Sequence, residues 1–279
     1  MNQQKADQTL LRGVSAEEST QQGDPVLITL RVSHYCEKAR WSLDRVGYRY
    51  REESHVPVAH RLVTSRHRGS SVPLLLCDGR RITESSDILR YINDQAGGAV
   101  FYPEEPLART EVSELESQFD RVLGPHSRRW AYWHLLPDSG LMKALWAQGA
   151  PRREVLLLPL ILPVARKLIR SAYKVTADGA QRSALRLQAV FDEVGERLSD
   201  GRPFLVGEQF TAADLTFASL SAPVILPPEC QASLPALEQV PPAMRDQILR
   251  LRDTPAGQYG LQLYSNQREK VVKAFPDPA

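Results

Sequence analysis

Two side chains that can do chemistry, the hydroxyl of Ser33 and the thiol of Cys36, lie three residues apart directly after the apolar run 26–32. The run predicts a buried strand, and serine is a favoured helix N-cap. The free amide groups and the dipole at a helix N-terminus stabilise an anion, and a hydroxyl placed there adds a hydrogen bond. A thiol in the same turn becomes a nucleophile when it is ionised. The segment therefore predicts an anion site or a reactive thiol.

The helix that must carry these groups can be traced by its apolar residues. Cys36, Ala39, Leu43 and Val46 recur at the spacing of one helix face, and Gly47 follows as a helix-ending residue. This spacing puts Cys36 on the buried side and favours an unreactive thiol in the core. A reactive Cys36 is the alternative.

The next elements complete a small α/β unit with the order βαβαββα. Asp78 and Gly79 form a sequence pair typical of a tight hairpin turn, and Ser85 or Ser86 is suited to start a helix. The elements expected after the first helix are a strand at 48–53, a short helix and loop at 56–68, hairpin strands at 72–77 and 81–83, and a helix that closes before residue 97.

The rest of the chain is expected to be helical. From Leu107 to Leu263 apolar residues recur at helical spacing, without a convincing strand. Thr211 and Asp214 have the spacing of a capping box, in which each side chain bonds a backbone N–H at the start of a helix. The sequence thus predicts an α/β domain followed by an all-α domain.

Three motifs, in this order and context, resemble the glutathione transferase family. They are Ser-His-Tyr-Cys at 33–36, Val72-Pro73 before the hairpin, and Glu84-Ser85 at a helix start. The capping box, preceded by Phe-Leu-Val-Gly-Glu at 204–208, is similar to the folding motif in the helical domain of this family.

The resemblance implies a fold and an activity. The fold is a thioredoxin-like, glutathione-binding domain at 25–98 followed by an all-helical domain at 105–279. The activity is that of a cytoplasmic, serine-type, homodimeric transferase with a role in detoxification. It would activate the thiol of its co-substrate glutathione and add it to a small hydrophobic electrophile.

The resemblance also implies roles for five residues. Ser33 would stabilise the glutathione thiolate. Val72, next to a cis bond to Pro73, would pair its backbone with the cysteinyl part of glutathione. Glu84 would bind the α-amino group of the γ-glutamyl end, and the hydroxyl of Ser85 would bind its α-carboxylate at a helix start.

Several features leave alternatives open. Residues 33–36 also resemble the Cys-Pro-Tyr-Cys site of glutaredoxins, with Ser33 in place of the attacking cysteine and His34 in place of the proline. A glutathione-dependent thiol, disulfide or peroxide reductase that uses Cys36 is therefore one alternative. A non-catalytic glutathione-fold binding module, in contact with a membrane surface, is another. Arg68 and Arg40 are candidates for binding the glycine carboxylate, and the sequence places neither.

The segment at about 126–182 makes the helical domain longer than is usual in the family. It holds ten lysines and arginines against three acidic residues, and three of the four tryptophans of the chain. Such a stretch can lie weakly on an anionic membrane surface, wall an apolar electrophile pocket or cover a dimer surface. It can also pack as extra core helices with a solvated basic face.

Composition excludes several classes of protein. The 279 residues, 42% of them hydrophobic, can form a full core, and a net charge of +2 gives no drive toward nucleic acid. Three widely spaced cysteines fit a reducing compartment. The polar stretch 1–24 is expected to be a disordered tail, and the apolar run 155–164 is too short to span a bilayer. No metal-ligand, P-loop or dinucleotide-binding motif is present, so no metal or nucleotide is expected.

Overall fold

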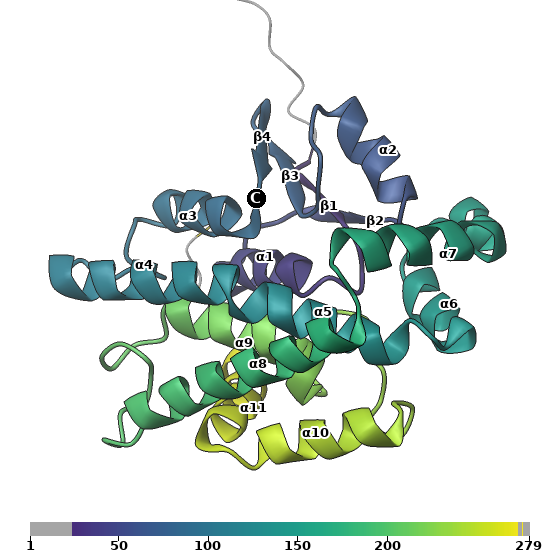
Figure 1. Ribbon diagram of the computed structural model, residues 1–279. Helices are drawn as coiled ribbons and strands as arrows, with labels where there is room; N and C mark the ends of the chain where they lie inside the picture. Colours follow the sequence, from purple (N-terminus) through teal and green to yellow (C-terminus); the bar gives the residue numbers. More distant parts are fainter. Residues whose placement is uncertain (1–23, 273–274, 276–279) are drawn as a thin grey trace, which may run out of the picture.

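The structure, a computed structural model, describes residues 24–272 and 275. Almost all of the disordered tail predicted at 1–24 therefore lies outside the described residues. Figure 1 shows a small sheet with its helices at the top and a larger group of helices below.

The first part of the chain alternates strands and helices in the predicted order. Its elements are β1 (Val26–Thr29), α1 (His34–Arg45), β2 (Arg51–Ser54), α2 (Ala59–Arg66), β3 (Leu74–Cys77), β4 (Arg80–Thr83) and α3 (Ser85–Gln95). Asp78 and Gly79, both with positive φ, form the predicted tight turn between β3 and β4. Gly47, with φ 70°, follows the end of α1 as predicted.

The four strands form one sheet in the order β2-β1-β3-β4. β1 is parallel to β2 and antiparallel to β3, which pairs in turn with β4. α1 and α3 pack against each other between this sheet and the lower helices (Figure 1). The layer of α1 and α3 thus joins the two parts of the molecule.

All four strands differ in extent from the sequence prediction, and β1 and β2 differ most. β1 ends at Thr29 instead of residue 32, because the chain turns there to start α1, with the Ser33 N–H donating to Leu30 O at 2.9 Å. β2 begins at Arg51 instead of residue 48, where its register with β1 starts. The turn after β1 frees the Leu30 side chain to line a pocket instead of extending the sheet.

After α3, the regular elements within the described residues are all helices. They are α4 (Pro106–Arg121), α5 (Leu123–Leu135), α6 (Ser139–Ala147), α7 (Arg152–Ala172), α8 (Ala177–Arg197), α9 (Ala212–Ile225), α10 (Pro242–Arg252) and α11 (Pro255–Gln267). The predicted fold class, a thioredoxin-like α/β domain followed by an all-α domain, is confirmed.

The fully buried helix α9 is the centre of the helical part and packs against α1, α4, α5 and α11. The predicted capping box is present at its start, where Asp214 accepts the N–H of Thr211 at 2.7 Å. The same carboxylate accepts the N–H of Leu205 at 2.8 Å and the hydroxyl of Tyr259 at 2.6 Å. Because its donors come from three segments, Asp214 holds the centre of the helical part together.

The basic segment at 126–182 forms parts of α5 and α8 and all of α6 and α7. Its inner side is anchored by Glu154 of α7, whose carboxylate lies 2.8 Å from His55 Nδ1 and accepts the Val56 N–H at 3.0 Å. Trp130 and Trp146 are buried in the core, whereas Trp133 is exposed. None of the helices in the described part of the chain combines the length and apolar character needed to cross a membrane.

Candidate active site

Ser33 is the N-cap of α1, as predicted. Its hydroxyl accepts the backbone N–H of Cys36 at 3.3 Å, which is a long hydrogen bond, and the residue lines a largely apolar pocket. Further free amide groups belong to the same first turn. Because a weakly held hydroxyl can exchange the amide for a ligand, the start of α1 has the components of an anion site.

The Cys36 thiol lies in the same turn but is not accessible. It is fully buried, lines neither of the pockets described here, and burial raises its pKa. Since the thiolate is the reactive form of cysteine, this environment suits a packing role. Ala39 and Leu43 on the same helix face are fully buried too, in agreement with the spacing.

His34, which follows Ser33, joins α1 to α5. Its ring is almost fully buried, with Nε2 at 3.0 Å from the carbonyl oxygen of Gly124. Burial, helped by the charge of Arg128, lowers the pKa of His34 to about 3. The ring is therefore neutral at pH 7, and its Nε2–H donates to Gly124 O. This bond holds the start of α1 against the start of α5.

A polar pocket lies beside the start of α3 and contains all four residues of the two later motifs, Val72, Pro73, Glu84 and Ser85. The Val72–Pro73 peptide bond is cis. Glu84 is exposed, and Ser85 is buried as the first residue of α3. An exposed carboxylate beside a helix N-terminus offers one partner for a cation and one for an anion, as the end of an amino acid requires.

A buried charge network ties the polar pocket to α1 and α4. Lys38 Nζ donates to Ser86 Oγ (2.7 Å), Glu116 Oε1 (3.0 Å) and Asp120 Oδ2 (2.8 Å). Asp120 lines the pocket, and within the described residues its other oxygen, Oδ1, is buried without a hydrogen-bond partner. The Asp120 carboxylate thus places negative charge at the wall of the polar pocket.

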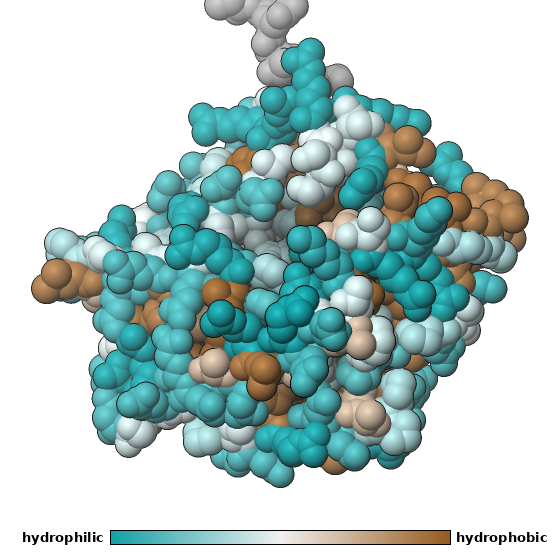
Figure 2. Space-filling model, in the orientation of Figure 1, coloured by the Kyte–Doolittle hydropathy of each residue, from teal (hydrophilic) through white to brown (hydrophobic). Residues whose placement is uncertain are grey.

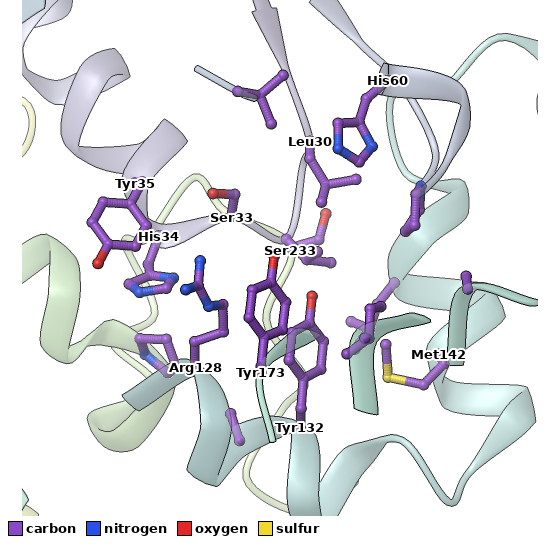
Figure 3. A pocket seen from close by; sticks show the side chains of 18 of the residues that line it. Leu30, Ser33, His34, Tyr35, His60, Arg128, Tyr132, Met142, Tyr173 and Ser233 are labelled. Atoms are coloured by element: carbon purple, nitrogen blue, oxygen red, sulfur yellow. The ribbon is translucent and has the colours of Figure 1, made fainter. Parts of the chain in front are cut away.

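The apolar pocket adjoins Ser33 (Figure 3). Tyr132 and Tyr173 stack in it with ring centroids 6.0 Å apart, and Figure 3 shows both hydroxyls pointing the same way. His60 also lines the pocket, and burial lowers its pKa to about 4, so the ring is neutral at pH 7. Apolar residues of the lining include Leu30, Leu135, Met142, Leu145, Ala165 and Ile169. Part of the basic segment at 126–182 thus walls an apolar pocket, one of the alternatives left open by the sequence.

Arg128 of α5 lies where the two pockets meet and lines both. Its guanidinium carbon is 3.9 Å from the ring centroid of Tyr173 and 5.6 Å from that of Tyr35. Figure 3 shows the side chain reaching between these rings toward Ser33. Its Nε is buried without a hydrogen-bond partner in the part of the chain that the structure describes. No motif marks Arg128 in the sequence, where it is one of ten basic residues in the segment 126–182.

Two other arginines considered from the sequence are not brought to this site. Arg40 is fully buried and paired with Glu37 at 3.2 Å and Glu52 at 2.9 Å. Arg68 is exposed and lines neither pocket. Within residues 24–272 and 275, no group of three or more His, Cys, Asp or Glu side chains is arranged to hold a metal ion.

The family described as "Glutathione S-transferase, N-terminal domain" matches residues 27–100. This part of the chain is thus similar in sequence to the N-terminal domain of glutathione S-transferases. Ser33, Val72, Pro73, Glu84 and Ser85 all lie within the matched range. No curated protein sequence matches the chain.

Solved structures extend the likeness to the helical part. A glutathione S-transferase of Ceriporiopsis subvermispora in complex with glutathione has a TM-score of 0.59, with 15% identity over 92% of this chain and 100% of its own. The β-etherase LigF of Sphingobium sp. strain SYK-6 has a TM-score of 0.54, with 18% identity over 86% and 99%. A glutathione S-transferase of Pseudomonas fluorescens has a TM-score of 0.51, with 18% identity over 84% and 97%. The chain therefore has the two-domain fold of glutathione S-transferases.

Proposed function

We propose that the protein is a glutathione transferase that activates the glutathione thiol at the start of α1 and adds it to a small apolar electrophile. The observation that carries this proposal is the junction of a polar and an apolar pocket, with Ser33 on the apolar side. The two pockets share Tyr35, Ser71, Val72 and Arg128. A charged tripeptide and an apolar second substrate require two such sites, with the reacting atoms held at their boundary.

The polar pocket supplies partners for the γ-glutamyl end of glutathione. The exposed carboxylate of Glu84 is an acceptor for its α-ammonium group, and Asp120 adds negative charge to the same pocket. The Ser85 hydroxyl and the first amides of α3 are donors for its α-carboxylate. Val72 lines both pockets, and its backbone would pair with the cysteinyl residue between them.

The groups at the start of α1 can stabilise a bound thiolate enough to lower the pKa of its thiol to near neutral pH. Lowering a thiol pKa from about 8.5 to about 6.5 requires roughly 2.7 kcal/mol of preferential thiolate stabilisation. A helix N-terminus contributes about 0.3–1 kcal/mol, and a hydrogen bond to a charged group about 1.5–3 kcal/mol. The Ser33 hydroxyl and the first turn of α1 can together supply the required amount.

In the proposed reaction the thiol proton passes to water and the thiolate attacks an electrophilic carbon. A carbon–sulfur bond forms, and the bond to a leaving group breaks or an electron pair moves onto a conjugated oxygen. Burial raises the pKa of Tyr132, so its hydroxyl stays protonated and can donate to the developing negative charge. Arg128, at the boundary of the pockets, adds a positive charge to the same region.

The alternative functions are less well supported by the geometry. A reductase that uses Cys36 needs an accessible thiol, and this one is buried outside both pockets. A non-catalytic binding module needs only the polar pocket, and leaves the stacked tyrosines and Ser33 without a role.

Calorimetry with reduced glutathione, followed by conjugation assays, tests the proposal. We expect binding at millimolar glutathione, and turnover with at least one member of a panel of aryl halides, enones and aryl ethers. Binding without turnover would favour the binding module. Disulfide exchange with a glutathione adduct on Cys36 would favour the reductase, and absence of binding would reject both enzymes.

We extend the same proposal to the compartment, the biological role and the oligomeric state of the protein. We infer a cytoplasmic detoxification enzyme that acts as a homodimer. The three cysteines are free in the described residues, as a reducing compartment requires. Sedimentation velocity of the purified chain would test the dimer.

A further inference from the structure

The outward face of α7 is apolar. Leu156, Leu157, Leu160 and Val164, here called the α7 face, are all at least half exposed, with Leu156 at 79% and Leu160 at 73%. Three of them recur every four residues and form one stripe along the helix. In the view of Figure 2, apolar side chains gather over α7, to the right of the molecule. A contiguous apolar stripe of this kind marks a surface that binds another molecule or a membrane.

Basic residues border the α7 face at both ends. Arg152 and Arg153 precede it, Lys167 and Arg170 follow it, and all four are exposed. The only carboxylate of α7, that of Glu154, points inward to His55 and Val56. The outward side of α7 therefore combines exposed leucines with positive charge and no negative charge, so its partner is anionic and accepts apolar side chains.

A second copy of the chain, joined through its own α7 face, is not the anionic partner that this face requires. In a twofold pair across the α7 face, antiparallel helices would place Arg152 and Arg153 beside Lys167 and Arg170 of the other copy. Parallel helices would place each basic end beside its own equivalent. Both arrangements bring like charges together at each end of the apolar contact, which is destabilising.

We propose that the α7 face docks on the surface of an anionic lipid bilayer. The leucines enter the boundary between headgroups and acyl chains, and the basic residues at both ends contact lipid phosphates or carboxylates. Pro159 and Pro163 lie in the middle of α7 and lack amide hydrogens, which leaves two helix carbonyls without their usual donors. Carbonyls without donors favour a hydrated interface over the hydrocarbon core, and α7 is not long and apolar enough to cross a bilayer.

Vesicle flotation with the full chain tests this proposal. We expect binding to phosphatidylcholine vesicles that contain phosphatidylserine or phosphatidylglycerol, loss of binding at high salt, and little binding to pure phosphatidylcholine. Leu156→Gln with Leu160→Gln should lower the partition coefficient at least tenfold. Arg152→Gln with Arg153→Gln should also lower it at least tenfold, and should reduce its salt dependence.

Matched controls keep the test specific. Leu107 and Leu185 are 80% and 67% exposed on other helices, and Arg80 and Arg81 are neighbouring exposed arginines in the hairpin. The same changes to Gln at these positions should leave the partition coefficient within twofold of the wild type. Circular dichroism checks that each variant is folded.

Three outcomes would overturn the proposal. They are no binding to anionic vesicles at low salt, equal binding to neutral vesicles, and a control variant that loses binding as strongly as the α7 variants. A wild-type oligomer that Leu156→Gln with Leu160→Gln converts to a monomer would show instead that a second copy covers the face. None of these readouts depends on glutathione or on turnover.

Discussion

Glu84 and Ser85, at the start of α3, line the pocket that we propose for the γ-glutamyl end of glutathione. We expect Glu84→Ala and Ser85→Ala each to weaken glutathione binding by about 1–3 kcal/mol, the range of a charge-assisted hydrogen bond. Glu104→Ala is a matched control, because Glu104 is exposed and lines neither pocket. Calorimetry measures all three. A dissociation constant for Glu84→Ala within twofold of the wild type would reject the γ-glutamyl assignment.

The buried thiol of Cys36 gives a second residue-scale prediction. Cys36→Ser puts a hydroxyl into a fully buried position, so we expect a loss of about 1–3 kcal/mol in the free energy of unfolding. Conjugation turnover should stay within about twofold of the wild type. Urea unfolding and a conjugation assay measure the two effects. A large loss of turnover at unchanged stability would point to a reactive Cys36.

His34 makes the stability of the fold depend on pH. Its pKa is about 3 in the folded chain and near 6.5 in an unfolded one, so the unfolded chain binds more protons between these values. The stabilisation is complete above pH 6.5 and is lost as the pH falls, by about 1.4 kcal/mol per pH unit for one proton. Between pH 6 and pH 5, the unfolding free energy of His34→Gln should therefore change less steeply than that of the wild type. His67→Gln, at an exposed position, is the control, and an unchanged slope in His34→Gln would contradict the assignment.

At the scale of elements, the start of α5 positions Tyr35 between the two pockets. A Cβ on Gly124 would lie in steric conflict with Tyr35 Oη, which donates to Asp120 O at 3.1 Å. We expect Gly124→Ala to destabilise the fold by about 1–3 kcal/mol and to weaken glutathione binding. Gly140→Ala, in the exposed first turn of α6, should be neutral or slightly stabilising, because a Cβ there would make only an ordinary contact, 3.4 Å from Asp138 Oδ1. Thermal unfolding compares the two; equal effects would mean that Tyr35 adapts freely.

Elements with local signals could be predicted from the sequence, whereas contacts between distant helices could not. The hairpin turn at Asp78, the N-cap at Ser33 and the capping box at Asp214 depend on residues a few positions apart, and all are present. Arg128 and Asp120 reach the site through the packing of α5 and α4 on α1 and α3. No spacing within one helix encodes that packing, so sequence reasoning missed both residues.

At the scale of the whole molecule, the site lies where the sheet layer meets the helices. Ser33, Val72 and Ser85 come from the first part of the chain, and Asp120 and Arg128 from the second. α7 contributes to both proposals, because its inner side walls the apolar pocket and its outer side carries the α7 face. With the α7 face on a membrane, as proposed, an apolar electrophile dissolved in that membrane would lie close to the apolar pocket proposed to bind it.

The pKa of the bound glutathione thiol is the most direct test of the central claim, that the start of α1 ionises this thiol. Ultraviolet absorbance of the thiolate, followed as a function of pH in the complex, measures it for the wild type and for Ser33→Ala. We predict a wild-type value at least one unit below that of free glutathione. In Ser33→Ala it should rise toward the free value, while conjugation falls about ten- to a thousandfold. A bound thiol with the pKa of free glutathione, or a Ser33→Ala enzyme with full activity, would contradict the account.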